Sequence, residues 1–215
     1  KQVISRKEHF MNRVFTIAIC TAGTVALMGC QRAVNNAVTQ SAMVAMAATP
    51  TAGGANKPLL EALQEENRSR TRTPMADLPP SGSATYTGFA QVISDRSVIP
   101  TTGTELVGKA RLEVGFAGTG SMTGTIDDFD DNGTDYGGSL TVSGGEISAG
   151  PNGPQVQSAV SGTLTNGGAS YDVDGNITGG FLGPDGEYLN GFDDITVTSG
   201  GKTSNTNISL NAARE

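Results

Sequence analysis

Residues 84–215 are predicted to form an all-β domain, an antiparallel barrel or sandwich of about eight strands. Two features of the sequence carry this prediction. Short runs of alternating apolar and polar residues succeed one another, with turn residues between them. Gly, Thr, Ser, Val and Asp dominate this part of the chain, and helix-forming residues are scarce there. Residues 30–83 lack this pattern, and we expect them to form a disordered tether.

A short basic segment and an apolar stretch of about 15 residues precede Cys30. The four residues that end at Cys30, Leu-Met-Gly-Cys, resemble the lipobox of bacterial lipoproteins, in which a peptidase cuts before the cysteine and the cysteine is acylated. We therefore expect a signal peptide that starts at Met11, removal of residues 1–29, and lipid attachment at Cys30. The alternative is an uncleaved anchor or a buried helix, although a membrane-spanning helix needs about 20 residues.

The expected mature chain excludes several kinds of chemistry. It contains no histidine and no cysteine besides Cys30, because His9 and Cys20 lie in the removed part. Ser-His-Asp or Cys-His catalysis, His/Cys zinc sites and disulfide bonds are therefore excluded. Residues 1–29 hold four basic residues and one acidic residue, so the totals of 14 and 21 fall to 10 and 20, a net charge of −10. We expect no nucleic-acid partner, no cofactor and no enzymatic activity.

The segment before the β-domain contains one helical pattern. Residues 31–56 are small and polar without a lasting period, which is typical of a flexible tether. Three leucines in residues 58–66 lie at helical spacing, and Pro58 suits a first helical turn. We interpret this segment as a marginal helix within the tether, and the alternative is a helix docked on the β-domain. Two prolines and a Ser-Gly-Ser sequence in residues 79–83 mark the domain boundary.

The clearest strand is predicted in residues 106–116. Every second residue there is apolar or glycine, and Lys109, Arg111 and Glu113 lie between them, which indicates one solvated face. The other predicted strands are residues 84–93, 120–127, 138–147, 155–165, 168–178, 188–198 and 204–211. Hairpin turns are predicted at Asp131-Asn132-Gly133, Pro151-Asn152-Gly153-Pro154 and Asn166-Gly167-Gly168.

Glycines inside these strands favour a closed barrel over a sandwich. Strand glycine lowers stability unless the sheet bends sharply or two backbones approach closely, and a small, tightly curved barrel does both. The glycines are Gly88, Gly108, Gly115, Gly124, Gly144, Gly162 and Gly175. Charged residues and Thr on the outward faces argue against a barrel that spans the membrane. We therefore predict an up-and-down antiparallel barrel of about eight strands.

In residues 180–192, Gly-Phe-Leu-Gly-Pro ends one strand, a turn containing Glu187 follows, and Gly191-Phe192 opens the next strand. This segment resembles a characteristic segment of the transferrin-binding protein B-like β-barrel family, and the Gly-Ser-Leu-Thr-Val sequence at residues 138–142 also fits. The resemblance implies an eight-stranded barrel of a surface or outer-membrane lipoprotein. The chain has room for one barrel and no handle domain, so the resemblance implies neither transferrin binding nor any binding residue.

The acidic segment 127–135, from Asp127 to Asp135, is the sharpest chemical feature. The residues that match positions 1, 3, 5 and 6 of a calcium-binding loop are Asp128, Asp130, Asn132 and Gly133. Position 12 is Ser139 rather than Glu, and no flanking helices are expected. We interpret the segment as a solvated hairpin turn, and a weak calcium site is the alternative. The other acidic pairs are Asp172 with Asp174 and Asp193 with Asp194, which we assign to solvated strand faces rather than to glycoside hydrolysis.

These observations together predict a lipid-anchored, non-enzymatic barrel of the bacterial outer membrane. We expect it to present loops to a protein or small-molecule ligand, from the periplasmic or the cell-surface face. Small inward residues indicate a filled interior, which favours recognition by loops. The alternatives are a structural envelope lipoprotein and a weak calcium-binding β-protein.

Overall fold

A computed structural model describes residues 56–93, 97–99 and 105–215 of the chain. These residues all belong to one compact unit, Thr39–Glu215. Cys30 and the tether up to residue 55 lie outside the described residues, so the expected lipid attachment and signal peptide stay predictions. Within the described ranges, no helix is long and apolar enough to cross a membrane.

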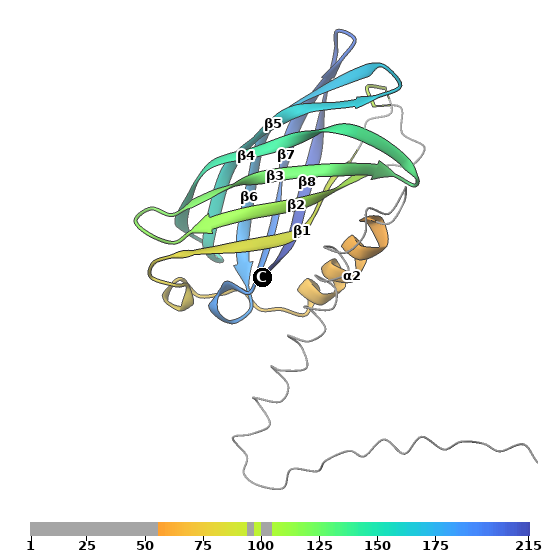
Figure 1. The fold of residues 1–215 in the computed structure, drawn as a ribbon. Helices are drawn as coiled ribbons and strands as arrows, with labels where there is room; N and C mark the ends of the chain where they lie inside the picture. The colour runs from red at the N-terminus through yellow and green to blue at the C-terminus, as the bar shows by residue number, and fades with distance from the viewer. Residues whose placement is uncertain (1–55, 94–96, 100–104) are drawn as a thin grey trace, which may run out of the picture. The chain divides into compact units, whose positions relative to one another are not determined.

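Eight antiparallel strands form a closed barrel, in which each strand pairs with its neighbours in sequence and β8 pairs with β1 (Figure 1). The strands are β1 (Ser83–Ile93), β2 (Glu105–Gly115), β3 (Ser121–Asp131), β4 (Thr134–Gly150), β5 (Gly153–Asn166), β6 (Ala169–Leu182), β7 (Tyr188–Ser199) and β8 (Lys202–Arg214). The predicted up-and-down barrel is therefore confirmed, and the alternative of a β-sandwich is excluded. Closure of the barrel also removes free strand edges, which otherwise allow pairing with other chains.

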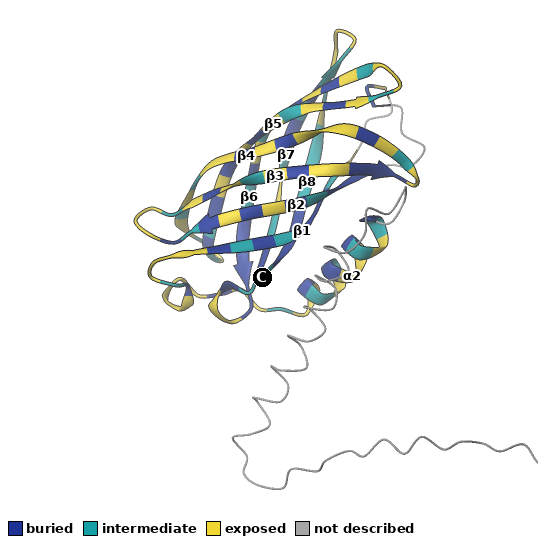
Figure 2. Ribbon diagram, in the orientation of Figure 1, coloured by how far each residue is buried: buried dark blue, intermediate teal, exposed yellow. Residues whose placement is uncertain are grey.

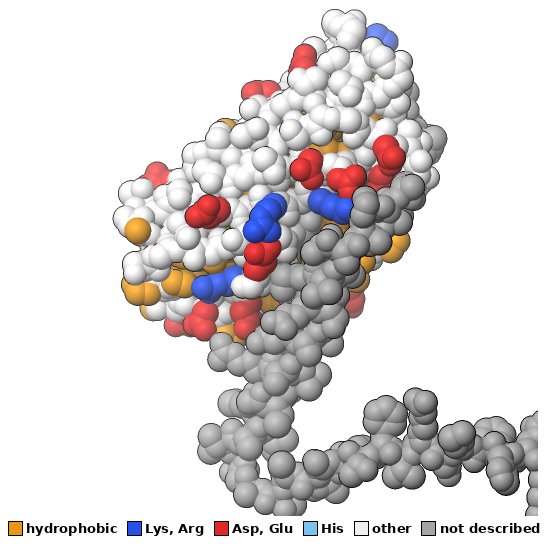
Figure 3. All heavy atoms as spheres, in the orientation of Figure 1, with side chains coloured by type: hydrophobic (Ala, Val, Ile, Leu, Met, Phe, Trp, Pro, Cys, Tyr) orange, Lys and Arg blue, Asp and Glu red, His pale blue; other side chains and the backbone are white. Residues whose placement is uncertain are grey.

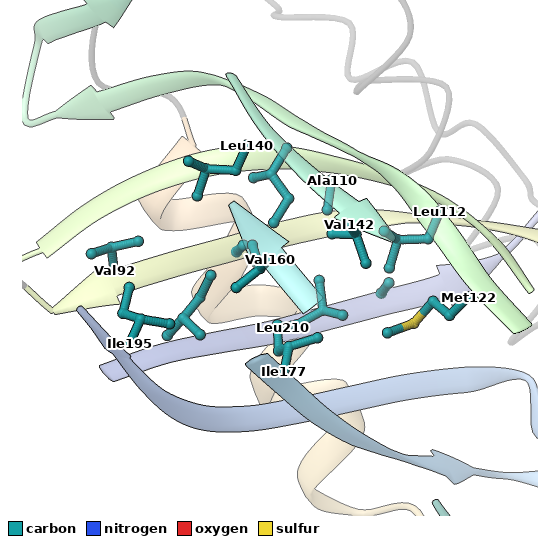
Figure 4. Close-up of a cluster of buried hydrophobic side chains, with 14 of the residues drawn as sticks. Val92, Ala110, Leu112, Met122, Leu140, Val142, Val160, Ile177, Ile195 and Leu210 are labelled. Atoms are coloured by element: carbon teal, nitrogen blue, oxygen red, sulfur yellow. The ribbon is translucent and has the colours of Figure 1, made fainter. Parts of the chain in front are cut away.

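The barrel interior is one apolar core. Buried and exposed residues alternate along much of the strands, as Figure 2 shows, and most of the buried residues belong to the cluster inside the barrel. In Figure 4, labelled core side chains from different strands, such as Leu112, Val160 and Leu210, lie together inside the barrel. Several inward residues are large rather than small, including the fully buried Tyr86 and Phe181. Their rings lie edge to face with centroids 6.3 Å apart.

Close approach explains two of the strand glycines, Gly88 and Gly108. A Cβ atom added at Gly88 would collide with the backbone of Asn211 and Ala212 on the neighbouring strand. One added at Gly108 would lie 2.7 Å from the ring of Phe129, which fills the space above this glycine. Backbone approach and ring packing therefore both require residues without a side chain.

Three hairpins are closed by two-residue turns in which both residues have positive φ. These turns are Asn132-Gly133, Gly167-Gly168 and Gly200-Gly201. Strand β4 is longer than the predicted strand at residues 138–147, because it begins at Thr134 directly after the first turn. Residues 134–138 contain one Asp and two Gly, residues that are rare in strands, so they carry little strand signal of their own. Pairing of Tyr136 with Phe129 on β3 supplies it instead.

Helix α2 (Asn56–Arg68) packs on the outer wall of the barrel. Leu60 and Leu63 are buried in a cluster formed with Phe89 of β1 and Val107 of β2. Our interpretation of this segment as a marginal helix within a flexible tether is therefore wrong, and the docked alternative is correct. The physical reason is that some outward side chains of the barrel strands are apolar and form a strip that α2 covers. The alternation of apolar and polar residues along a strand assigns every outward residue to the solvated face, so it does not reveal this strip.

Polar contacts hold both ends of α2. At its start, Nδ2 of Asn56 donates to the carbonyl oxygens of Val107 and Asp128, at 3.1 and 2.7 Å. Beyond its end, the guanidinium of Arg70 lies over the ring of Tyr188, 4.7 Å from the ring centroid. Glu66 accepts hydrogen bonds from both of these residues, at 3.0 Å from Arg70 and 2.6 Å from the Tyr188 hydroxyl. The helix is thus an integral layer of the domain.

Candidate functional site

The acidic segment forms the β3–β4 hairpin, as predicted, but the prediction that the whole segment is solvated is wrong. Asp128 lies at a bulge with φ 52°, and its carboxylate pairs with Lys109 Nζ at 2.5 Å. Asp130 and Asp131 are buried, with 5% and 1% exposure. The residues that a calcium loop would use are therefore split between the outer wall and the underside of α2. No group of three or more acidic, His or Cys side chains that could hold a metal ion occurs in the described part of the chain.

Asp130 serves the helix rather than a ligand. Its Oδ2 accepts a hydrogen bond from the backbone N–H of Asn56, at 3.4 Å. Burial raises the pKa of Asp130 above its ordinary value of 3.8, and the Asn56 N–H offsets this rise only in part. The neighbouring carboxylates of Asp135 and Asp128 raise it further. This aspartate therefore gives α2 a buried acceptor that is costly to ionise.

Two aspartates of the other acidic pairs, Asp172 and Asp193, accept hydrogen bonds from neighbouring residues. Asp172 accepts a hydrogen bond from Thr163 Oγ1 at 2.8 Å. Asp193 accepts from Thr178 Oγ1 at 2.7 Å and from the Asp194 N–H at 2.9 Å. These cross-strand contacts agree with our assignment to solvated strand faces, and they give no pair of carboxylates flanking a cleft.

The segment that resembles the barrel family forms the end of β6, the short helix η2 (Pro184–Gly186) and the start of β7. Gly183, Asp185 and Gly186 all have positive φ. The Tyr86 hydroxyl donates to the Gly186 carbonyl at 2.5 Å, so this turn closes the barrel base. Turn geometry and base closure thus account for the Gly-Pro-Asp-Gly sequence without a ligand.

The turn also fixes the chain that leads from α2 into the barrel. Thr73 Oγ1 donates to the Gly183 carbonyl at 2.6 Å, and the Gly183 N–H donates to the Thr71 carbonyl at 2.9 Å. Arg72 forms an antiparallel bridge with Leu182. Residues 71–73 therefore lie against the end of β6 with a fixed backbone.

Beside this contact, the outer wall carries a shallow hollow of about 150 Å³, which we call the wall recess. Its lining residues are Arg72, Gln155, Thr178, Gly179, Gly180, Asn190, Gly191 and Phe192. Gly180 lies between Gln155 and Asn190 in the strand register, with all three on the outer face. Because Gly180 has no side chain, the Arg72 guanidinium lies directly over it, where a Cβ atom would collide with Nη1. None of the lining residues is acidic.

Arg72 differs from most other cations of the domain. In Figure 3, blue and red side chains lie next to one another on the face that carries β1–β3. The ion pairs among the described residues are Lys57–Glu105, Arg68–Glu65, Arg70–Glu66, Lys109–Asp128 and Arg111–Glu215. Within the described ranges the exposed Arg72 side chain has neither a hydrogen-bond nor an ion-pair partner. Its charge is therefore available to a ligand.

A second hollow, of about 320 Å³, lies at the barrel base beside the short helix η1 (Met75–Asp77). We call it the base groove. Its apolar lining includes Met75, Leu78, Pro79, Pro80, Phe116 and Ile147. Hydrophobic side chains are visible along this lower rim in Figure 3. The groove lacks charged side chains that would select a ligand.

The expected recognition loops are short where the structure describes them. Three hairpins at one end of the barrel have two-residue turns, which present little surface beyond the strands. The alternation pattern did not indicate Arg72 or Phe192 as site residues. A signal for Arg72 was present in the sequence. Arg68 and Arg70 each have a Glu partner three or four residues earlier, whereas Arg72 has no Glu at that spacing.

Comparison of the chain with models of known protein families finds no match, and comparison with curated proteins finds none either.

Proposed function

We propose that this chain is a lipid-anchored, non-enzymatic binding module of the bacterial outer membrane, a single barrel similar to those of transferrin-binding protein B-like proteins. The observation that carries the binding role is the wall recess, where the Arg72 guanidinium lies unpaired on an acid-free surface. An apolar core fills the barrel, so a ligand binds on the outside. The Leu-Met-Gly-Cys sequence at Cys30 supports the anchor.

The non-enzymatic role is supported by what surrounds each reactive group. The carboxylates Asp172 and Asp193 are hydrogen-bonded to threonines on an open wall, where water is not excluded. Lys109 is paired with Asp128. General acid–base chemistry needs groups with perturbed pKa values held together in a cleft, and these groups are dispersed.

The anchor is tested by replacing Cys30→Ser and labelling cells with a palmitate analogue. We expect the parent chain to take up label and to sediment with membranes, whereas the variant loses both properties. Label that persists in the Cys30→Ser chain would contradict lipid attachment at this residue. Protease added to intact cells then tests the face: digestion before lysis indicates the cell surface, and protection until lysis indicates the periplasm.

A structural envelope lipoprotein is the second candidate, and it is favoured by the two-residue turns, because the described hairpins at that end of the barrel present little surface for recognition. Photo-cross-linking separates the two functions. A cross-linking residue at Gln155, beside the wall recess, should capture a discrete partner in cells if the chain is a binding module. Thr203, at the opposite end of the barrel, is the matched exposed control. Absence of a discrete product at every outer-wall position would favour the structural role.

A further inference from the structure

We propose that the wall recess binds an acidic side chain, Asp or Glu, of a protein partner, while an apolar residue of the same partner packs on Phe192. This inference rests on the proposed binding function and adds the location and chemistry of recognition. Three features of the recess carry it: a pre-positioned guanidinium, an exposed aromatic ring beside it, and a rim of uncharged hydrogen-bonding side chains.

Arg72 is pre-positioned for a carboxylate. Its backbone is fixed by the bridge to Leu182 and by the Thr73 N–H, which donates to the Phe181 carbonyl at 3.0 Å. Its guanidinium, although exposed, lies over Gly180. A planar guanidinium binds a carboxylate through two parallel hydrogen bonds, and the fixed backbone of Arg72 lowers the entropy lost on binding. No carboxylate of the described residues pairs with this guanidinium, which leaves it open to a carboxylate of a partner.

Phe192 supplies the apolar contact. It is 56% exposed, the most exposed large hydrophobic residue in the described ranges. It pairs in register with Thr178 on β6, two residues before Gly180, so the ring and the guanidinium line the same hollow. Arg and aromatic residues are enriched among the residues that dominate protein–protein binding energy.

The dimensions of the recess favour a protein side chain over a free small molecule. Pockets that enclose small ligands have volumes of about 300–1,000 Å³, whereas this hollow is about 150 Å³ and open to solvent. One side chain fits it, and the surrounding wall then contributes area. Gln155 and Asn190 lie on either side of Gly180 and provide donors and acceptors for the partner backbone.

The test is a selection of random dodecapeptides displayed on phage against the purified full chain, followed by anisotropy measurements with the selected peptides. We expect enrichment of Asp or Glu next to an aliphatic or aromatic residue. Arg72→Gln in the protein and Glu→Gln in the peptide should each weaken binding about tenfold, and the two changes together should weaken it no more than one alone. Phe192→Ala should weaken it about fivefold.

Lys202→Gln is the matched control, because Lys202 is an exposed cation at the opposite end of β7 and β8. It should leave peptide binding unchanged. Circular dichroism of the Arg72→Gln chain should match that of the parent, because Arg72 is exposed. Gly180→Ala, which displaces the guanidinium while the charge stays, should also weaken binding.

Three outcomes would overturn the inference: selected peptides without acidic residues, equal binding by the Arg72→Gln chain, or loss of binding in the Lys202→Gln chain. Titration with glucuronate or inorganic phosphate is a fourth arm. Arg72-dependent binding of these anions without binding of acidic peptides would assign the recess to small anions. A discrete cross-link from another wall position, with none at Gln155, would preserve the proposed binding function and refute this location.

Discussion

Two parts of the outer wall differ in what covers them. On the side formed by β1, β2 and β8, α2 covers an apolar strip, and Phe89 is 1% exposed. On the side formed by β5, β6 and β7, Phe192 is 56% exposed beside the wall recess. Both phenylalanines occupy outward positions of barrel strands. The wall of a closed barrel is therefore part of the core where a second element packs on it, and an open surface where none does.

The chain before β1 determines this difference. Helix α2 is held over β1 and β2, and residues 71–73 then pass to the end of β6. This path places Arg72 beside β5–β7 and leaves Phe192 uncovered. The same N-terminal segment thus completes the fold on one side and contributes to the candidate site on the other.

The largest expected effect compares the two phenylalanines. Phe89→Ala should lower the free energy of unfolding by about 3–5 kcal/mol, because it opens a cavity under α2. Phe192→Ala should change it by less than about 0.5 kcal/mol, because the ring is exposed. Urea unfolding followed by circular dichroism measures both. Equal losses in the two variants would mean that α2 does not cover the β1 side in solution.

Two glycines provide the next comparison, because a Cβ atom collides at both. At Gly88 it meets the backbone of β8, which cannot move without breaking strand pairing, so Gly88→Ala should lower stability by about 1–3 kcal/mol. At Gly180 it meets the end of the flexible Arg72 side chain, so Gly180→Ala should cost less than about 0.5 kcal/mol. Thermal unfolding of both variants checks this order. A Gly180→Ala chain as unstable as Gly88→Ala would show that the wall beside Arg72 is rigidly packed.

Asn56→Ala tests the hydrogen bonds that hold the start of α2 on the barrel. The change removes the donor to two carbonyl oxygens and should lower stability by about 1–3 kcal/mol. Asn205→Ala, at an exposed position of β8, is the control and should be neutral within about 0.5 kcal/mol. Hydrogen exchange should also show faster exchange of the α2 amides in the Asn56→Ala chain. Unchanged exchange of these amides would mean that the buried leucines alone hold α2 on the barrel.

The smallest effect concerns Asp130 and pH. Its folded-state pKa is raised, so its ionisation destabilises the fold, and stability from this residue is lost as pH rises from 3.8 through the folded pKa. Asp130→Asn keeps an acceptor for the Asn56 N–H and removes the buried charge. The variant should therefore be more stable than the parent at neutral pH and should lose this advantage below about pH 3.8. Urea midpoints across this range measure the difference, and an advantage independent of pH would refute a buried ionised Asp130.

Sequence patterns predicted much of the barrel. Period-two alternation indicated the strands, and turn-forming residues such as Asn132-Gly133 indicated the turns. The same alternation failed where a residue was outward but buried, as for Phe89. It also gave the acidic segment a calcium alternative, because spacing along the chain does not record that Asp130 faces the underside of α2. Arg72 was not predicted as a site residue, because its position depends on pairing with Leu182, which is 110 residues later in the chain.

The sequence by itself determined the local geometry of this protein: which residues alternate, where glycine permits a turn or a close approach, and which charges have partners one helical turn away. These are short-range effects of backbone sterics and side-chain period. Only the tertiary structure decided which part of the outer wall is buried and which is open. That decision depends on where α2 and residues 71–73 pack, and such contacts join segments far apart in sequence.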